Sequence, residues 1–489
     1  MVNKQKKATQ FDAIIVGSGP NGLAAAIRLA LEGLKVKVFE ASETVGGGMR
    51  TGELIRSGYL HDICSAIHPM AVSSPFMNRL PLDKYGLEWI HPVHPAAHPL
   101  DDEPAAILYN DIHETAFHLD DDEKMYLKSV ENIAEKWGLL SSDILAPLRF
   151  PSNPADMMKF GLKALQPASL FSKRFNTERA KALFAGMVAH TILPFDKLAT
   201  AAVGLVFFAT AHNKGWPIPK RGSQSIANAM ARYLESLGGE IETSAEIKKL
   251  SDLPSSSAVL FDLTPRQVLR IVGDDFPLKY RRKLTRFQYG SGVFKVDYIL
   301  KEPVPWKDHE CRRAGTVHVG GSFEQIAASE KKVYDGEHPE DPFVLVAQQS
   351  LFDESRTPDE KQTLWAYCHV PNGSKSDMTE KIENQIERFA PGFKDVIDER
   401  ITMNTIGFQA YNANYIGGDI NGGRQNLSQL FCRPTGIYRP YATPAKGIYF
   451  CSSSTPPGGG VHGMCGYHAA QLALKNEFGF KKSDLQFNL

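Results

Sequence analysis

The stretch FDAIIVGSGPNGLAAAIRLALEG, residues 11–33, decides the fold. Residues 11–16 form a short apolar run typical of a buried strand, and the alanine- and leucine-rich residues 22–32 are typical of a helix. Residues 35–40, KVKVFE, return to a strand pattern. Strand, glycine-rich turn, helix and strand in this order predict a βαβ unit, and therefore an α/β fold.

The turn between the first strand and the helix contains glycines at three spaced positions. Gly17 permits the tight turn, Gly19 lets a pyrophosphate approach backbone N–H groups, and Gly22 allows the helix to pack closely on the strand. Glu40 follows at the end of the second strand, where an acid accepts a hydrogen bond from a ribose hydroxyl. The pattern predicts a dinucleotide-binding site.

Composition describes a globular protein with no excess of either charge. The chain has 489 residues, 43% hydrophobic and 22% charged, which is enough for two or three domains. Its 55 Lys and Arg balance 55 Asp and Glu, so we expect no nucleic-acid partner. The longest uncharged apolar stretch, residues 198–211, is too short to span a membrane. With no secretion signal and six scattered cysteines, we expect a cytoplasmic protein with reduced thiols.

Further elements are predicted from periodicity. A helix is expected from about Asp121, with Tyr126, Val130, Ile133 and Trp137 on its apolar face. Residues 223–237 predict a second helix, and residues 241–250, 258–263 and 293–300 predict strands. The histidines at 91, 94 and 98 are each followed by proline, which forbids the helix that would align them, so no metal site is expected.

Two more glycine-rich segments accompany the first. ETVGGGMRT, residues 43–51, comes soon after the second strand, and GIYFCSSSTPPGGGVHGMCG, residues 447–466, precedes a helical HAAQLAL. Together the three motifs resemble those of the phytoene desaturase-like FAD-dependent oxidoreductases, in particular a soluble branch of that family. The similarity extends to residues 216–234, 289–306 and 414–423.

The resemblance implies FAD as cofactor and a discontinuous Rossmann-like domain of the amine oxidase and desaturase type. This FAD-binding domain would comprise residues 1–85, 215–290 and 435–489, and an α+β substrate-binding domain would comprise 86–214 and 291–434. The implied cofactor-binding residues are Gly17, Gly19, Pro20, Asn21, Gly22, Glu40, Ala41, Gly47, Gly48, Met49, Arg50, Ile247, Ser453, Gly459, Gly460 and Val461.

The chain departs from the family in one place. Many relatives have a Gly-Asp pair at the end of the C-terminal strand, where Ser452 and Ser453 stand here. A serine hydroxyl can contact the ribityl chain without the charge. No second GxGxxG with an acid at the proper spacing is present, so we expect no tightly bound nicotinamide nucleotide, and oxygen or a quinone is the expected electron acceptor.

Two residues are candidates for catalysis. Lys295 lies in GSGVFKVDYIL, which resembles the strand whose lysine holds a water at flavin N5 in monoamine-oxidase-type enzymes; the alternative is an ordinary charge on an edge strand. His462, in the PPGGGVHG turn, has an ordinary pKa near neutrality that suits proton transfer; the alternative is a supporting hydrogen bond behind the site. His68 is expected to be structural.

The expected function is hydride transfer from an apolar, lipid-like or terpenoid substrate to flavin N5. Residues 198–211 are uncharged and contain Phe207 and Phe208, and Phe160, Leu165, Leu170 and Phe171 precede them, which predicts an apolar channel open to the surface. Peripheral contact with a membrane is compatible with this pattern. Two alternatives stay open: a flavin amine oxidase, and a non-catalytic escort-type binding protein on the same fold.

Overall fold

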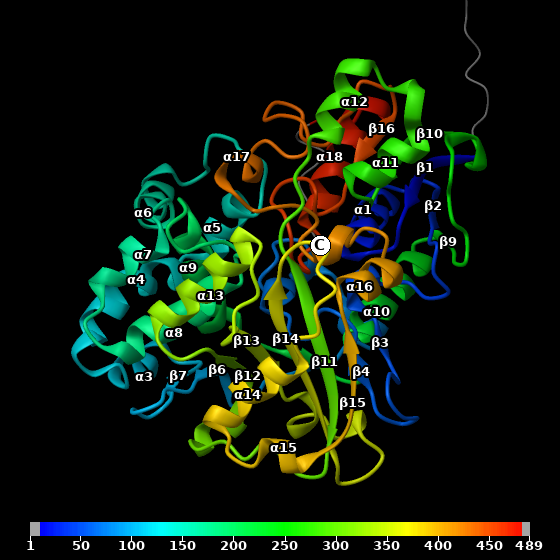
Figure 1. Ribbon diagram of the computed structural model, residues 1–489. Helices are drawn as coiled ribbons and strands as arrows, with labels where there is room; N and C mark the ends of the chain where they lie inside the picture. The colour runs from blue at the N-terminus through cyan, green and yellow to red at the C-terminus, as the bar shows by residue number, and fades with distance from the viewer. Residues whose placement is uncertain (1–9, 482–489) are drawn as a thin grey trace, which may run out of the picture.

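The computed structural model, which describes residues 10–481, contains a five-stranded parallel sheet assembled from three distant parts of the chain (Figure 1). Its strand order is β16-β10-β1-β2-β9. The strands are β1 (Phe11–Val16), β2 (Val36–Phe39), β9 (Glu240–Glu242), β10 (Ser256–Phe261) and β16 (Ile448–Phe450). All four pairings are parallel, so the carboxyl ends of these strands meet at one edge.

Helices cover both faces of this sheet because residues on its strands alternate between them. Ala13 and Ile15 of β1 pack with α1, α10 and α18, whereas Ile14 and Val16 pack with α11 and α12. These helices are α1 (Pro20–Ala30), α10 (Gln224–Ser236), α11 (Pro265–Val272), α12 (Leu278–Thr285) and α18 (Met464–Glu477). At Gly466, an added Cβ would lie 1.8 Å from the Asn21 carbonyl oxygen, so glycine permits α18 to lie against α1.

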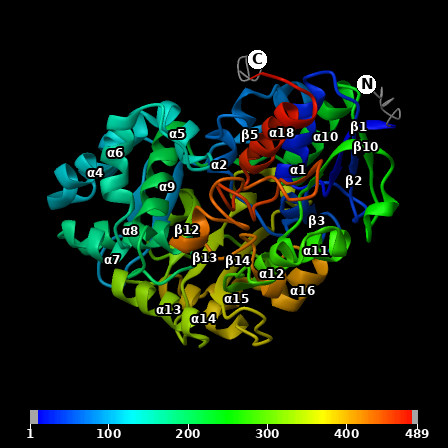
Figure 2. The same cartoon turned by 90° about the horizontal axis from the view of Figure 1, so that it is seen from above.

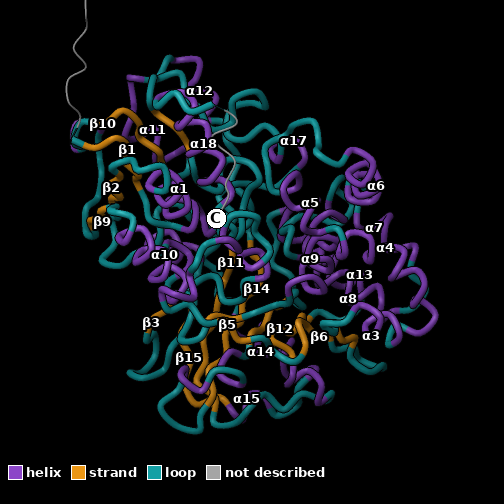
Figure 3. Tube along the Cα trace, turned by 180° about the vertical axis from the view of Figure 1, so that it is seen from behind, coloured by secondary structure: helices purple, strands orange, loops and turns teal. Residues whose placement is uncertain are grey.

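The second sheet has seven mixed strands in the order β15-β11-β14-β13-β12-β6-β7. The strands are β6 (His94–His98), β7 (Ala106–Leu108), β11 (Gly292–Leu300), β12 (Ala314–Val319), β13 (Val344–Ala347), β14 (Gln362–Val370) and β15 (Ile397–Met403). The remaining strands form two short pairs: β3 (Thr51–Gly52) with β4 (His61–Asp62), and β5 (Trp89–Ile90) with β8 (Ile218–Pro219). From behind, the two sheets lie in separate parts of the molecule, the parallel sheet at the upper left and the second sheet in the lower centre (Figure 3).

Most of the remaining helices gather in a lobe away from the parallel sheet (Figure 2). The lobe comprises α3 (Ile112–Phe117), α4 (Glu123–Glu135), α5 (Trp137–Ile144), α6 (Pro154–Ala164), α7 (Ala168–Phe171), α8 (Glu178–Ala189), α9 (Thr200–Lys214) and α13 (Phe323–Asp335). The other helices are α2 (Pro69–Val72), α14 (Thr379–Phe389), α15 (Phe393–Val396), α16 (Thr405–Tyr411) and α17 (Leu427–Leu430). No helix in residues 10–481 is long and apolar enough to cross a membrane.

Two predicted elements differ from the structure. The strand expected over 241–250 ends at Glu242, because Ser244 takes a left-handed conformation (φ 55°) and the chain then leaves the sheet edge, with the Ala245 N–H donating to the Glu40 carbonyl at 2.8 Å. The helix expected from Asp121 begins at Glu123 and ends at Glu135. Trp137 therefore belongs to α5, not to the apolar face of the same helix.

Candidate functional site

A cavity of about 1240 Å³ lies at the carboxyl edge of the parallel sheet and extends to the second sheet and the helical lobe. Val16, Phe39 and Asp262, at the ends of three parallel strands, line one part of it, and Trp365 of β14 and Val203 of α9 line another. Its volume exceeds the range of roughly 300–1,000 Å³ typical of small-molecule sites. The cavity therefore has room for a dinucleotide and a second molecule.

The three glycine-rich segments meet at this cavity. The Gly46 N–H donates to the Ser18 carbonyl at 3.0 Å, and an added Cβ at Gly47 would lie 3.0 Å from the Gly19 Cα. The predicted cofactor-binding residues that line the cavity are Gly17, Gly19, Pro20, Asn21, Glu40, Ala41, Gly47, Gly48, Arg50, Ile247, Ser453, Gly459, Gly460 and Val461.

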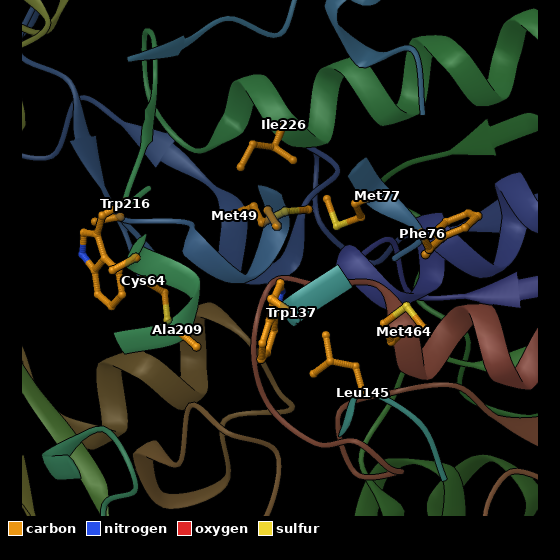
Figure 4. Close-up of a cluster of buried hydrophobic side chains, with 14 of the residues drawn as sticks. Met49, Cys64, Phe76, Met77, Trp137, Leu145, Ala209, Trp216, Ile226 and Met464 are labelled. Carbon is orange, nitrogen blue, oxygen red and sulfur yellow. The ribbon is translucent and has the colours of Figure 1, made fainter. Parts of the chain in front are cut away.

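Two predicted cofactor-binding residues lie outside the cavity lining. An added Cβ at Gly22 would lie 2.1 Å from the Gly17 carbonyl oxygen, so Gly22 permits close packing of turn and helix. Met49 is fully buried and lies in one hydrophobic cluster with Ile226 of α10 and Met464 of α18 (Figure 4). Both residues support the loops that line the site.

Glu40 connects the first two glycine segments. Its buried carboxylate accepts from the Ser18 N–H at 2.9 Å and the Ser18 hydroxyl at 2.5 Å, and also from the Ser42 N–H at 2.9 Å. The Arg50 guanidinium donates to it at 3.1 Å and to the Thr44 carbonyl at 2.8 Å. Glu40 thus holds Arg50 and the turn after β1 in one network at the place where a ribose hydroxyl would bind.

Asp262 is a site residue that the sequence reasoning missed. It follows β10, lines the cavity and accepts from the Gly22 N–H at 2.9 Å, close to the N-terminus of α1. Burial and, to a lesser extent, the charge of Glu40 raise the pKa of its carboxyl to about 7, against the hydrogen bonds from the Gly22 and Gly19 N–H groups, which lower it. Its signal in the sequence was an acid near the carboxyl end of the strand predicted over residues 258–263.

Residues 411–415, which precede the third glycine-rich segment, contact both the second glycine-rich segment and the residue that follows β10. The Tyr411 hydroxyl donates to the Gly47 carbonyl at 2.6 Å, and the Asn414 side-chain amide donates to the Asp262 carbonyl at 3.3 Å. Tyr411, Asn414 and Tyr415 all line the cavity. These contacts were not predicted, because residues 291–434 were assigned to the substrate-binding domain and similarity to the family was noted only for residues 414–423.

Lys295 lies beneath the cavity wall and does not line it. Its ammonium group is hydrogen-bonded to the Asp297 carboxylate, and both side chains are almost fully buried. The Lys295 Nζ lies 6.0 Å from the centre of the Trp365 ring, and Trp365 and Tyr367 form the wall above the ion pair. The proposed contact of Lys295 with a water at flavin N5 stays a prediction.

His462 is likewise buried behind the glycine turn and outside the cavity lining. Its Nδ1 accepts from the Met464 N–H at 3.0 Å, and its carbonyl accepts from the Ser74 hydroxyl at 2.7 Å. Burial lowers the pKa of the imidazole to about 4, so it is neutral at pH 7. The first turn of α18 also lies outside the lining, whereas Gly459, Gly460 and Val461, which precede it, line the cavity.

The part of the cavity away from the glycine loops is largely apolar. Phe160, Leu165, Val203, Val206 and Phe207 line it. The other aromatic and aliphatic side chains expected there are not in the lining: Leu170, Phe171 and Phe208. Phe208 instead packs against Tyr126 in the core, with ring centres 5.3 Å apart.

Two histidines give the inner end of the apolar part some polarity. His190 lines the cavity, and its Nε2 lies 3.2 Å from the Nε2 of His318. Burial lowers the pKa of His190 to about 3 and also lowers that of His318, so the pair is uncharged at pH 7. His68 also lines the cavity, where its Nε2 lies 2.8 Å from the Ser223 hydroxyl. Among residues 10–481, no group of three or more His, Cys, Asp or Glu side chains is arranged to hold a metal ion.

Fold and site together define an α/β protein with a Rossmann-like domain whose glycine loops line a large cavity. Residues 15–80 match the family of NAD(P)-binding Rossmann-like domains. Over 96% of this chain and 94% of the relative, the chain is 21% identical to the mouse (Mus musculus) pyridine nucleotide-disulfide oxidoreductase domain-containing protein 2. It is 22% identical to a 4,4'-diapophytoene desaturase of Staphylococcus haemolyticus, over 91% of this chain and 95% of the relative.

Solved structures show the same fold. A redesigned putrescine oxidase superposes with a TM-score of 0.60 and 18% identity, over 95% of this chain and 98% of that one. The resemblance to phytoene desaturase-like oxidoreductases is thus confirmed, as is the expected α/β fold of the amine oxidase and desaturase type. The homologues and structural neighbours are oxidoreductases, which confirms the expected class of enzyme.

Proposed function

We propose that the protein is a FAD-dependent oxidoreductase that takes a hydride from an apolar, lipid-like or terpenoid substrate. The observation that carries the proposal is the single cavity shared by the three glycine-rich segments and the apolar side chains of α6 and α9. FAD bound there would supply N5 as the hydride acceptor, with oxygen or a quinone as the final electron acceptor. The chain's own residues would bind, orient and shield the reactants.

The polar groups around the glycine loops fit a dinucleotide. Gly19 is the N-cap of α1, and it has no side chain that could cover the N-terminus of the helix. The positive end of the helix dipole lies there and favours a negatively charged group. Glu40 and Ser42 lie where a ribose would be bound, and Ser453 lies near the turn formed by Gly459 and Gly460. A hydroxyl at Ser453 can hydrogen-bond to a ribityl chain without the acid found in many relatives.

The substrate side favours an apolar molecule. Each methylene buried against Phe160, Val206 or Phe207 contributes about 0.8 kcal/mol to binding. The 4,4'-diapophytoene desaturase to which the chain is similar bears the name of a terpenoid substrate. Hydride removal from such a substrate requires that water be excluded, which a deep apolar chamber provides.

Amine oxidation is a second candidate, favoured by an aromatic wall. Trp365 and Tyr367 line the cavity with ring centres 4.9 Å apart, and aromatic faces attract ammonium groups. A cation would also need an acid in this part. The carboxylates in the described lining are Glu40 and Asp262 at the glycine loops, Glu246 beside Ile247, and Asp143, which is already paired with Arg149 at 2.9 Å. The lack of a free acid near Trp365 favours the apolar substrate.

The first experiment is the absorption spectrum of the purified protein. We expect a yellow protein that releases FAD on denaturation. Colourless protein that does not take up added FAD would contradict the proposal and favour a non-catalytic, escort-type binding protein.

The second experiment is anaerobic reduction of the bound flavin by two panels of compounds. One panel contains carotenoid precursors and fatty acyl compounds, and the other contains small primary amines and polyamines. We expect reduction by members of the first panel. Reduction by amines alone would assign amine oxidation, and reduction by neither panel would refute the proposed substrate class while leaving the flavin site intact.

A further inference from the structure

Two polar side chains, His190 and Thr316, line the largely apolar part of the cavity. His190 directly follows the last residue of α8, and Thr316 lies on β12. The His190 ring meets the ring of Phe207 edge to face, with ring centres 4.8 Å apart. His190 therefore stands among the side chains that would hold an apolar substrate, and the proposed function assigns no role to it or to Thr316.

The two residues belong to one wall of the cavity. Alternation along β12 places Thr316 and His318 on the same face of the second sheet, whereas Val317 and Val319 pack in the hydrophobic cluster on the other face. The His190 Nε2 lies 3.2 Å from the His318 Nε2. The His190–His318 pair and Thr316 thus share the face of β12 that is turned to the cavity.

The surroundings of His318 decide which nitrogen atoms of the pair carry protons. The His318 Nδ1 is buried and has no hydrogen-bond partner among residues 10–481. A Cβ added at Gly186 of α8 would lie 2.5 Å from it, so a Cα–H of Gly186 faces this nitrogen. A C–H group beside a nitrogen lone pair is weakly attractive, whereas a buried N–H without an acceptor is rare. His318 is therefore protonated at Nε2, and this N–H donates to the His190 Nε2.

This assignment leaves His190 with a hydrogen-bond donor open to the cavity. Because burial lowers the pKa of both imidazoles, His190 is neutral at pH 7 and carries its one proton on Nδ1. Unlike the His318 Nδ1, the His190 Nδ1 is not enclosed by the protein, and no residue in the described range 10–481 hydrogen-bonds to it. The acceptor for this N–H has to come from a molecule in the cavity.

Thr316 supplies a second donor. Its Oγ1 accepts from the Trp216 Nε1–H at 2.7 Å, and its own hydroxyl hydrogen has no acceptor among residues 10–481. Within the described part of the chain, His190 and Thr316 have no ion pair or hydrogen bond with a charged side chain. Two neutral donors without a charged neighbour suit a neutral acceptor such as a carbonyl oxygen, which has two lone pairs.

We propose that His190 and Thr316 bind a carbonyl oxygen of the substrate, so that the substrate is an apolar chain bearing an ester, ketone or aldehyde group. The inference rests on the proposed function and narrows its substrate class. The apolar chain lies along Val206 and Phe207, and the two donors fix its carbonyl group at the wall formed by β12. A pure hydrocarbon would leave both donors unpaired in a dry cavity, which weakens its binding.

The first test is the infrared spectrum of methyl palmitate, isotope-labelled at its carbonyl carbon and bound to the purified, unmodified protein. Donation from His190 and Thr316 should lower the C=O stretching frequency below its value for the ester in an apolar solvent, because a hydrogen bond weakens the C=O bond. In His190→Phe the band should return towards that value. A band of the bound ester that is unshifted in the unmodified protein would overturn the inference, whether or not any variant folds.

The second test compares the affinities for methyl palmitate and for octadecane, a hydrocarbon of the same chain length, by the change in tryptophan fluorescence. His190→Phe should reduce the ratio of ester affinity to hydrocarbon affinity on the order of tenfold, since the carbonyl loses a donor. His190→Gln keeps a side-chain N–H and should lose less. Thr316→Ser keeps the hydroxyl and should retain the ratio, whereas Thr316→Val should reduce it.

The matched control is Val206→Ala, which shortens an apolar residue of the same lining. It should weaken the binding of ester and hydrocarbon by similar factors and leave their ratio unchanged. An unchanged ratio in His190→Phe, or tighter binding of palmitate than of its methyl ester, would overturn the inference. Binding of neither chain would overturn the apolar substrate class as well, whereas binding of both with an unshifted carbonyl band would overturn the carbonyl site alone. None of these readouts involves flavin reduction.

Discussion

Replacement of Asp262 by asparagine should change how the stability of the cofactor-free protein depends on pH. The pKa of Asp262 is raised from 3.8 to about 7, mainly by burial. Because the folded protein holds this proton more tightly than the unfolded chain, the stabilisation from protonation is complete below pH 3.8 and is lost as pH rises towards 7 and beyond. The asparagine side chain is neutral at every pH, so the variant lacks this contribution.

The magnitude follows from the size of the shift. Each pKa unit corresponds to about 1.4 kcal/mol, so a displacement of about three units corresponds to about 4 kcal/mol over the whole window. Between pH 5 and pH 7, unmodified protein should lose about 2 to 3 kcal/mol of unfolding free energy relative to Asp262→Asn. The amide can still accept from the Gly22 N–H through its oxygen, so the turn after β1 is retained.

The assay is urea unfolding of both proteins, stripped of cofactor, from pH 5 to pH 8. Asp12→Asn is a matched control, since Asp12 lies near the start of the same sheet and accepts from the Lys35 N–H at the surface. Parallel pH profiles for unmodified protein and Asp262→Asn would refute the reasoning. We also expect FAD affinity to fall above pH 7 in the unmodified protein and not in the variant, because a pyrophosphate near Gly19 favours the protonated carboxyl.

Three further outcomes are expected. Glu40→Ala should weaken FAD binding by about 1–3 kcal/mol, measured by flavin fluorescence, because ribose hydroxyls and Arg50 lose their acceptor; unchanged affinity would remove Glu40 from the site. NADH or NADPH added anaerobically should not bleach the flavin at a useful rate, since the sequence contains a single nucleotide-binding motif; fast stoichiometric reduction in stopped flow would contradict this. Lys295→Met should slow substrate oxidation or flavin reoxidation about tenfold, or about 1.4 kcal/mol, with FAD still bound; unchanged rates in both half-reactions would make Lys295 structural.

The parallel sheet and the glycine loops could be predicted because their signals are local. The central strands β1, β2 and β10 are short segments rich in apolar residues, and Gly17 occupies a positive-φ conformation (φ 99°) that a glycine adopts without strain. The early end of β9 could not be predicted, because Ala245 and Ile247 continue the alternation of apolar and polar residues that is typical of a strand. What ends the strand is a tertiary contact, the hydrogen bond from Ala245 to Glu40.

The aromatic wall could not be predicted, because it depends on strand register between distant segments. Alternation along residues 293–300 indicates that Lys295 and Asp297 share a face, and nothing local shows which side chains lie opposite. Only the pairing of β11 with β14 places Tyr367 opposite Lys295 and Trp365 opposite Asp297. Asp262 is an intermediate case: its strand was predictable, but its contact with Gly22 belongs to the assembled sheet.

This register gives Lys295 two distinguishable roles. Residues directly opposite in an antiparallel pair have side chains on the same face, so the Lys295–Asp297 ion pair lies beside the rings of Tyr367 and Trp365 and supports them laterally. Lys295→Met would leave the Asp297 carboxylate buried without its cation, 3.6 Å from the His61 Nδ1, and would disturb the wall. Adding Asp297→Asn to Lys295→Met removes that uncompensated charge. If Lys295 acts only through the wall, the double variant should recover the rate; if its ammonium group acts at the flavin, the double variant should stay as slow as the single one.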